Sequence, residues 1–235
     1  MPFSIAGLQK LTLLDFPKKT ACIVFLAGCD FRCHVCHNSE LVLPERMEKP
    51  SLSQKEFFQF LEKRKGLLDG VCVTGGEPTV HPSLPKFLWD IRGHGFLVKL
   101  DTNGNNPKML SDILSQNLVD YVAMDIKASS EEKYSAFTGV KVNFQNITVS
   151  RDLLLSSGVP HEFRTTMVRE FHDENEFQNI LSFLRGVDRY FLQNFRREGS
   201  CLNSEWEAMH GFSREELLKK KLLAEQFVKQ VELRL

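Results

Sequence analysis

The sequence predicts an α/β protein whose parallel strands form a partial (β/α)6 barrel of the TIM type. Apolar segments of strand length alternate with amphipathic segments of helix length along the 235 residues, and this alternation is typical of a parallel sheet covered by helices. No glycine-rich nucleotide-binding motif appears, which favours a barrel over an open doubly wound sheet. Six units are fewer than the eight of a closed barrel, so we expect an incomplete one.

The expected strands are short apolar runs enriched in β-branched residues. They cover residues 20–28, 70–74, 95–100, 120–124, 162–168 and 189–193, and "QVELRL" at 230–235 is a candidate for a last strand. The mildly apolar N-terminus is interrupted by Lys10 and Asp15, and no small-residue cleavage site follows it. This segment is therefore not a convincing signal peptide, and it is not among the expected strands.

The expected helices lie between these strands. Ser53 and Glu56 form a capping box that opens the first helix, which can end at Gly66. Ser213 and Glu216 open the last helix in the same way. The remaining helices are expected at 83–95, 109–116, 150–158 and 175–186, and residues 39–53 are expected to form a long loop over the active face.

The composition is that of an ordinary globular protein and excludes several classes. Hydrophobic residues make up 42% of the chain and charged residues 26%, and no linker divides it, so we expect a single domain over residues 1–235. Thirty basic and thirty acidic residues cancel, which gives no indication of nucleic-acid or membrane binding. The longest apolar run, "ACIVFLAG", is far shorter than the roughly 20 residues that span a bilayer. We expect a cytoplasmic protein, where clustered cysteines indicate metal or redox chemistry.

Unusual polar residues lie in or directly after six consecutive expected strands. The carboxyl ends of parallel barrel strands meet at one rim, where active sites of such barrels lie, so these residues are expected to share a site. In strand order they are Cys29, Cys33 and Cys36; Gly75, Gly76 and Glu77; Asp101 and Thr102; Asp125 and Lys127; Arg164; and Gln193.

The three cysteines are spaced C-x3-C-x2-C. Thiolates grouped in this way usually hold a metal, and closed zinc and iron–sulfur sites take four protein ligands. The fourth coordination position is either filled by a protein group, for which Cys201 and His37 are the candidates, or left open. Zinc motifs more often begin with C-x2-C, so iron–sulfur ranks above zinc. Cys22 and Cys72 lie in apolar strands and are most simply core residues.

The loop "TGGEP" at 74–78 follows the second strand. Gly75 and Gly76 allow a close backbone approach to a ligand or a positive φ. A phosphate-binding loop would carry a lysine, whereas Glu77 stands here. The loop therefore suits a cationic or amine-bearing ligand.

These motifs resemble those of the radical S-adenosylmethionine (radical SAM) superfamily, whose three cysteines occupy the loop after the first strand. Within it, the chain is similar to the glycyl-radical-enzyme activating enzymes, and most of all to the activating proteins of anaerobic ribonucleoside-triphosphate reductase. The resemblance covers nearly the whole chain from about residue 5 and rests on "GLQKLTLLDFP", "CIVFLAGCDFRCHVCHN", "TGGEPT", "DTNG", "MDIK" and "LQNFR".

The resemblance implies the cofactors and the reaction. Cys29, Cys33 and Cys36 would bind three irons of a [4Fe–4S] cluster, and S-adenosylmethionine would chelate the fourth through its amino and carboxylate groups. An electron from a flavodoxin- or ferredoxin-type donor would cleave the cosubstrate into methionine and a 5′-deoxyadenosyl radical. That radical would abstract a hydrogen atom from a backbone glycine of a large partner, which we expect to be anaerobic ribonucleotide reductase.

The resemblance also implies roles for the remaining site residues. Gly75, Gly76 and Glu77 would cradle the methionine amino end, and Asp101 and Thr102 would lie beside the methionine carboxylate, where related enzymes hold a monovalent cation. Asp125 and Lys127 would reach the same region, Arg164 and Gln193 would make polar contacts to the cosubstrate, and Asp15 would face the incoming glycine loop. Val35 occupies the place of an aromatic residue near the adenine, and His34 that of a proline.

Two alternatives remain open at this stage. One is a radical SAM enzyme that acts on a small molecule, as 7-carboxy-7-deazaguanine synthase does. The other is a non-catalytic iron–sulfur or zinc-binding module, in which Cys201 or His37 supplies the fourth ligand.

Overall fold

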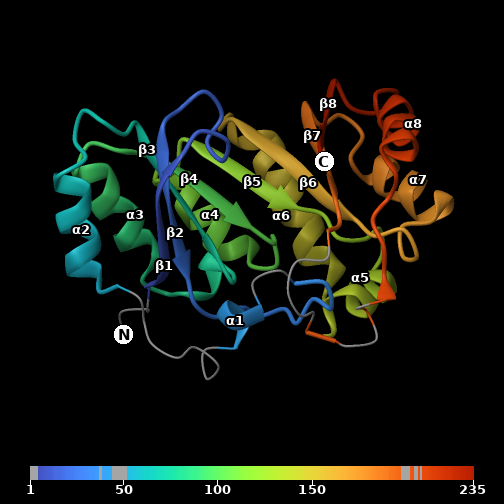
Figure 1. Ribbon diagram of the computed structural model, residues 1–235, viewed down its shortest axis with the longest axis horizontal. Coiled ribbons are helices and arrows are strands. Elements are labelled where there is room, and N and C mark those ends of the chain that lie inside the picture. The colour runs from blue at the N-terminus through green and yellow to red at the C-terminus, as the bar shows by residue number, and fades with distance from the viewer. Residues whose placement is uncertain (1–4, 37–38, 44–51, 197–201, 204–205, 207) are drawn as a thin grey trace.

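The computed structural model describes residues 5–36, 39–43, 52–196, 202–203, 206 and 208–235. Eight strands form one sheet in which the strand order is the order along the chain (Figure 1). The strands are β1 (Ile5–Thr12), β2 (Ala21–Leu26), β3 (Gly70–Gly75), β4 (Leu97–Thr102), β5 (Tyr121–Asp125), β6 (His161–Met167), β7 (Arg189–Asn194) and β8 (Gln230–Arg234).

Helices connect most of the successive strands. They are α1 (Ser39–Val42), α2 (Gln54–Glu62), α3 (Leu84–Gly93), α4 (Pro107–Ser115), α5 (Glu131–Thr138), α6 (Phe144–Ser157), α7 (Glu174–Phe183) and α8 (Arg214–Ala224), with a short 3₁₀ turn, η2 (Pro78–Val80). Across the described part of the chain, no helix combines the length and the apolar character that crossing a bilayer requires.

Strands β2 to β8 are parallel, and each of the six expected strands is present. The predicted α/β class and the mostly parallel sheet are thus confirmed. The candidate last strand is β8, which pairs with β7.

The N-terminal strand β1 is the exception to an all-parallel sheet. It runs antiparallel to β2, with Ile5 opposite Leu26 and Thr12 opposite Ala21, and it lies outside the six predicted barrel strands, which are all parallel. Only its two end residues are buried, as is common for an edge strand with one partner. This leaves too few apolar positions for a strand signal in the sequence.

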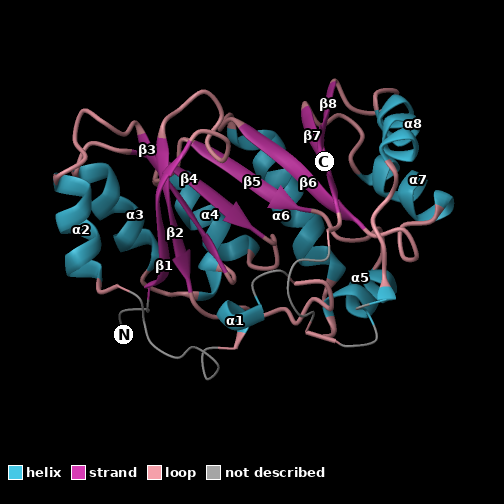
Figure 2. Ribbon diagram, in the orientation of Figure 1, coloured by secondary structure: helices cyan, strands magenta, loops and turns pink. Residues whose placement is uncertain are grey.

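Two layers account for the core. Helices α3, α4 and α6 lie on one face of the sheet (Figure 2), and the main hydrophobic core joins sheet residues such as Val73, Leu100 and Val122 to helix residues such as Leu88 and Ile113. Each of these side chains is fully buried, which stabilises the fold by about 1.5–3 kcal/mol per large aliphatic side chain. Strand residues on the opposite face, such as Ile23 and Cys72, are buried in a second cluster with Phe16. The central strands are therefore buried on both faces and read as continuous apolar runs.

Both predicted capping boxes are present, at Ser53 with Glu56 and at Ser213 with Glu216. The first helix ends at Glu62 rather than at Gly66. The expected helix at 150–158 corresponds to α6, which begins six residues earlier, at Phe144 after an Asn143 cap.

Two helices were not expected. Helix α5 is capped by Ser130 and ends at Gly139, which has a left-handed φ of 67°. It buries only Tyr134, Phe137 and Thr138, so its sequence lacks a clear apolar stripe. Helix α1 lies inside the segment expected to be a loop, of which residues 44–51 fall outside the described residues.

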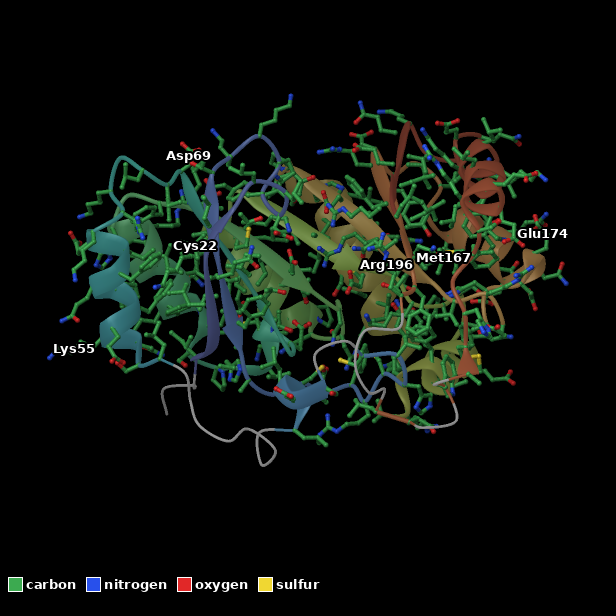
Figure 3. All side chains as sticks on the ribbon, viewed as in Figure 1. Cys22, Lys55, Asp69, Met167, Glu174 and Arg196 are labelled. Carbon is green, nitrogen blue, oxygen red and sulfur yellow. The ribbon has the colours of Figure 1, made fainter. Side chains whose placement is uncertain are left out.

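Cys22 and Cys72 are both buried, as expected for core cysteines. In Figure 3, Cys22 lies within the body of the molecule, whereas the charged side chains of Lys55, Asp69 and Glu174 lie at its periphery.

The carboxyl ends of the parallel strands meet at one end of the sheet, and α1 and α5 lie at that same end (Figure 1). Asp15 lies at the other end, because it follows Thr12, which pairs with the first residue of β2, and its carboxylate accepts a hydrogen bond from the Thr12 hydroxyl. Cys29 follows the last residue of β2. Asp15 is not among the residues that line the cavity, and its contact with a substrate loop stays a prediction.

Candidate active site

A cavity of about 290 Å³ opens at the carboxyl ends of the parallel strands. Its lining includes the thirteen residues that the sequence placed at the site: Cys29, Cys33, Val35, Cys36, Gly75, Gly76, Glu77, Asp101, Thr102, Asp125, Lys127, Arg164 and Gln193. Seven further lining residues were not predicted: Phe31, Val42, Thr74, Asn103, Ile126, Phe137 and Thr166. The structure thus brings the predicted residues together, while the role of each stays a prediction.

Helix α5 holds the cysteine loop in place. The Arg32 amide donates to the carbonyl of Thr138 at 2.9 Å, and the His34 amide donates to that of Phe137 at 3.2 Å. Between the cysteines, Phe31 is buried and meets the ring of Tyr134 edge-on. The last turn of α5 therefore shapes the backbone that presents the thiols.

The two glycines of the TGGEP loop are required by packing against the cysteine strand. Gly75 has a φ of 129°, and a Cβ there would lie 2.2 Å from the Leu26 carbonyl oxygen. A Cβ at Gly76 would lie 2.1 Å from the Gly28 carbonyl oxygen. The amides of Gly76 and Glu77 donate to the carbonyls of Leu26 and Gly28, both at 2.8 Å. The positive φ at Gly75 is one of the two possibilities that the sequence gave for this pair. Both glycines bring the two loops together, and a close approach to a ligand stays a prediction.

The Glu77 carboxylate is committed to the protein itself. Its Oε1 accepts from the Thr79 amide at 3.0 Å, the Thr79 hydroxyl at 2.6 Å and the Thr102 hydroxyl at 2.7 Å, and its Oε2 accepts from the Asn103 amide at 2.6 Å. A carboxylate oxygen offers about two acceptor positions, so Oε1 is fully used by the protein, whereas Oε2 keeps one position for a further donor.

Burial and the neighbouring Asp30 carboxylate raise the pKa of Glu77 to about 7, although its hydrogen-bond donors oppose the shift. Asp30 was not predicted as a site residue. It accepts from the side-chain amides of Asn103 and Asn105, each at 2.8 Å. Through Glu77 and Asp30, the β4 loop is tied to both the TGGEP loop and the cysteine loop.

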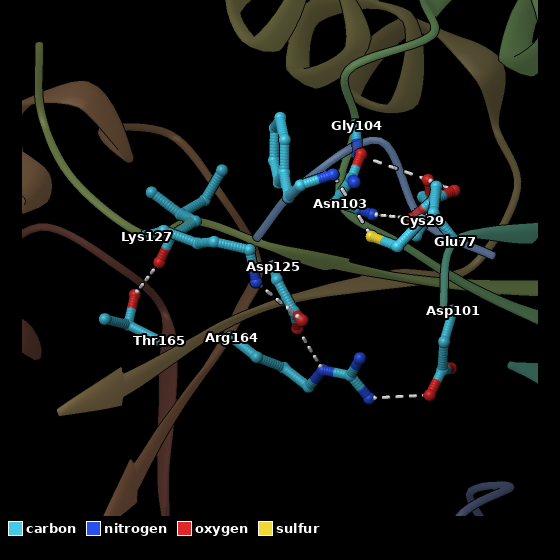
Figure 4. Close-up of polar contacts among 12 residues, drawn as sticks. Cys29, Glu77, Asp101, Asn103, Gly104, Asp125, Lys127, Arg164 and Thr165 are labelled. Carbon is cyan, nitrogen blue, oxygen red and sulfur yellow. Dashed lines mark hydrogen bonds and ion pairs between the residues drawn. The ribbon is translucent and has the colours of Figure 1, made fainter. Parts of the chain in front are cut away.

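A chain of alternating charges crosses the floor of the cavity (Figure 4). Arg164 donates from Nε to Asp125 at 2.8 Å and from Nη1 to Asp101 at 3.0 Å. Lys99 pairs with the other oxygen of Asp101, and Lys127 pairs with the other oxygen of Asp125 at 3.3 Å. Lys99 is buried and was not predicted as a site residue.

These ion pairs outweigh burial for the two carboxyls. Burial opposes ionisation, but Arg164 and Lys99 lower the pKa of Asp101 to about 2, and Arg164 and Lys127 lower that of Asp125. Although burial opposes its charge, the carboxylates raise the pKa of Arg164. Asp125 also raises that of Lys127, and the Cys33 and Cys29 thiols contribute to this shift.

His172 is a further residue that the sequence did not reveal. It is fully buried, its Nδ1 accepts from the Val168 amide at 2.9 Å, and its Nε2 lies 3.1 Å from the carbonyl of Lys127. The ring thereby joins the segments that follow β5 and β6 and fixes the backbone of Lys127. Burial lowers the pKa of His172 to about 4.

We expect the free energy of unfolding to fall as His172 is protonated. The unfolded pKa of about 6.5 exceeds the native value, so the contribution is complete above pH 6.5 and is lost as pH falls toward 4. At about 1.4 kcal/mol per pKa unit, the loss is about 3 kcal/mol. Urea unfolding at several pH values from 4 to 7.5 gives the free energy of unfolding of wild type and of His172→Gln. The difference between the two proteins measures the contribution of His172 at each pH.

The His172→Gln variant should be less stable than wild type at pH 7.5, and this gap should close toward pH 4. His161→Gln serves as the control, because His161 is half-buried and lies at the start of β6, away from the cavity. A gap between wild type and His172→Gln that is constant with pH would contradict the prediction.

The cysteine loop offers the donor set of an iron–sulfur site. Burial raises the pKa of Cys33 to about 11, with Lys127 opposing the shift, and burial likewise raises the pKa of Cys29. Metal ligation requires thiolates, so loading a cluster would release protons here. Among the described residues, no three His, Cys, Asp or Glu side chains are already placed to hold a metal ion, and His37 and Cys201 lie outside them.

Apolar groups close one side of the cavity. Val35 is buried among Phe137, Val168 and Phe195, with Trp206 packed against this cluster. The ring of His34 lies 4.9 Å from that of Trp206, centroid to centroid. Val35 therefore lines the cavity through its packing with aromatic side chains, although it is not aromatic itself.

Comparison with known proteins agrees with this geometry. The model of the radical SAM superfamily matches residues 23–184. A putative glycyl-radical enzyme activating enzyme from Methanocaldococcus jannaschii is 30% identical over 196 residues, which are 81% of this chain and 79% of the relative. The 7-carboxy-7-deazaguanine synthase of Neisseria meningitidis is 38% identical, but over only 64 residues, 27% of each chain.

The fold also matches solved structures. A domain of a pyruvate-formate lyase-activating enzyme from Bacteroides vulgatus superposes with a TM-score of 0.58 at 17% identity, covering 70% of this chain and 98% of that domain. The three clustered cysteines, the TGGEP loop and the strand-end carboxylates all fall within the matched family region. The chain therefore belongs to the radical SAM superfamily, and it is an enzyme homologous to the glycyl-radical enzyme activating enzymes.

Proposed function

We propose that this enzyme generates a glycyl radical on a partner enzyme by reductive cleavage of S-adenosylmethionine, and that the partner is anaerobic ribonucleoside-triphosphate reductase. The observation that carries the activase assignment is the similarity over four-fifths of the chain to a relative with that name. The choice of partner rests on the sequence motifs alone. We propose the cytoplasm as the compartment, since the cysteines must stay reduced.

The superfamily uses a [4Fe–4S] cluster and S-adenosylmethionine, and the residues of the cavity fit both groups. Cys29, Cys33 and Cys36 offer three thiolate donors to the cluster. When bound and reduced, the cluster would supply the one electron that divides the cosubstrate into methionine and a 5′-deoxyadenosyl radical, the species that would take a hydrogen atom from the glycine. We propose a flavodoxin or ferredoxin as the source of that electron.

The protein groups would position the cosubstrate around this chemistry. The charged floor holds three cationic side chains against two carboxylates, which leaves one positive charge for a ligand carboxylate. Gln193 and Thr166 add neutral polar groups to the lining. The apolar side formed by Val35 and Phe137 would shield the reacting region from water.

Two anaerobic assays test the proposal in sequence. The reconstituted protein is reduced with dithionite and given S-adenosylmethionine, and 5′-deoxyadenosine and methionine are measured. The purified reductase is then added, and we expect a glycine-centred radical in its electron paramagnetic resonance spectrum. A variant of the reductase with alanine in place of the radical glycine is the matched control and should give no such signal.

The outcomes separate the alternatives. Cleavage with no radical on the reductase, but with a radical on pyruvate formate-lyase, would correct the partner and keep the activase function. Cleavage coupled only to a small molecule, as the deazaguanine-synthase alternative requires, would replace the activase proposal. No cleavage by a loaded and reduced cluster would contradict both.

A further inference from the structure

Every oxygen of the two carboxylates on the cavity floor already pairs with a cationic side chain, so a metal ion there would have to share its ligand oxygen with a positive charge. Asp101 accepts from Lys99 at Oδ1 and from Arg164 at Oδ2, and Asp125 accepts from Arg164 at Oδ1 and pairs with Lys127 at Oδ2. Each of the four carboxylate oxygens therefore contacts a different nitrogen of a cationic side chain. The guanidinium of Arg164 lies between the two carboxylates (Figure 4).

The charge balance disfavours an additional cation. The floor contains two carboxylates and three cationic side chains, which gives a net charge of +1. Lys99 is 1% exposed and its Nζ also lies 6.0 Å from the centre of the Tyr121 ring, so this charge is fixed in the interior. Before the cosubstrate binds, an alkali metal ion would raise the net charge of these five side chains to +2, which adds a desolvation cost.

The remaining candidate ligand is also engaged. The Thr102 hydroxyl donates to Glu77 at 2.7 Å and accepts from the Gly104 amide at 3.1 Å. The pair that the family resemblance assigned to a monovalent cation, Asp101 and Thr102, thus has both side chains committed to protein groups. The residues present do not fit that ion.

We infer that in this chain the Arg164 guanidinium takes the place of the monovalent cation, and that the cavity floor receives the cosubstrate carboxylate without an alkali metal ion. Arginine is suited to this place because its planar fork bridges two carboxylates with fixed geometry. The inference depends on membership of the radical SAM superfamily and not on the identity of the partner enzyme.

The test measures S-adenosylmethionine binding to the cluster-loaded, unreduced protein in chloride salts of potassium, sodium or choline at equal ionic strength. Equal ionic strength holds general screening constant. We expect dissociation constants that agree within about twofold, because a tenfold difference already corresponds to about 1.4 kcal/mol of coupling. Binding that is tenfold or more tighter in potassium or sodium than in choline would overturn the inference.

Arg164→Gln supplies the second arm, because it removes the bridging charge and leaves the two carboxylates facing each other. This variant should have a melting temperature several degrees higher in potassium chloride than in choline chloride, whereas wild type should show no difference. Arg189→Gln is the matched control: Arg189 lies in β7 and bonds Tyr121 and Glu232 rather than the floor carboxylates, so it should behave as wild type does.

If the melting temperature of Arg164→Gln is the same in potassium and in choline chloride, a metal ion cannot enter the position of the guanidinium. That result would overturn the inference that the guanidinium takes the place of a metal ion. If that variant does not fold, the wild-type binding series still decides the inference. Neither arm uses a partner protein, so failure here leaves the proposed activase function untouched, and failure of the radical assay leaves this inference untouched.

Discussion

Gly76→Ala is expected to lower the free energy of unfolding by about 3 kcal/mol or more, at the upper end of what single substitutions cost. The added Cβ would lie 2.1 Å from the carbonyl oxygen and 2.6 Å from the carbonyl carbon of Gly28. Both atoms belong to backbone, so no side-chain rotation can relieve the overlap. The loop that carries Glu77 would have to separate from the loop that carries Cys29.

The same change elsewhere in the chain should be harmless. Gly93 ends helix α3, and a Cβ there meets no atom within 4 Å and requires no positive φ. Gly93→Ala should leave stability unchanged or raise it by up to about 1 kcal/mol, since alanine is the better helix former. Urea unfolding of the two variants and the wild type measures both effects.

Gly76→Ala protein that still folds should also bind S-adenosylmethionine more weakly, because the added Cβ displaces the loop that carries Glu77. The amides of Gly76 and Glu77 now donate to the Leu26 and Gly28 carbonyls, which fixes the loop against the start of the cysteine segment. Equal stability of Gly76→Ala and Gly93→Ala would show that this backbone contact is not required, and the explanation of the GG pair by packing would be wrong.

The sequence revealed the parallel part of the fold because each strand is covered by helices. Strand β3 buries both of its faces, as the adjacent residues Val71 and Cys72 show, so such strands appear as continuous apolar runs between capped helices. Strand β1 gave no such signal, since Gln9, Lys10 and Leu11 are exposed at the sheet edge. Helix α5 was missed because its stability comes from packing Tyr134 and Phe137 under the cysteine loop.

The candidate site was predictable to the extent that topology determines it. Parallel strands bring their carboxyl ends together, so polar residues at successive strand ends had to meet. What each side chain contacts was not predictable, because Glu77 could face a ligand or Thr79, and only the tertiary structure decides. Asp30 and His172 act through partners more than 40 positions away, Asn105 and Lys127, and no local pattern marks such pairs.

The charged floor illustrates the difference between composition and arrangement. The family resemblance implied a monovalent cation beside Asp101 and Thr102, with Asp125 and Lys127 in the same region. Lys99 lies two positions before Asp101 in an apolar strand, on the same face of the sheet, and its pairing with Asp101 became visible only in the structure. Once Lys99 and Arg164 are counted, the floor is a cationic surface rather than an acidic one.

Cys33→Ala is expected to abolish cluster binding and to reduce S-adenosylmethionine cleavage by about three orders of magnitude or more, as removal of an essential catalytic group does. Cys33 lines the cavity between the other two cysteines in the sequence and lies near Lys127. With two thiolates left, the loop cannot supply three iron ligands. Iron content, visible absorbance after anaerobic reconstitution, and 5′-deoxyadenosine formation measure the loss.

Cys72→Ala is the matched control, because Cys72 is 1% exposed in strand β3 and packs against apolar residues including Ile23 and Tyr121. It should lose about 1 kcal/mol of stability from the small cavity and retain the cluster.

Cys201→Ala addresses the fourth coordination position directly. If the cosubstrate supplies that ligand, Cys201→Ala should keep both the iron content and the cleavage activity of wild type. Loss of the cluster in Cys201→Ala would place the fourth ligand in the protein, and a closed four-cysteine site leaves no iron free to bind S-adenosylmethionine.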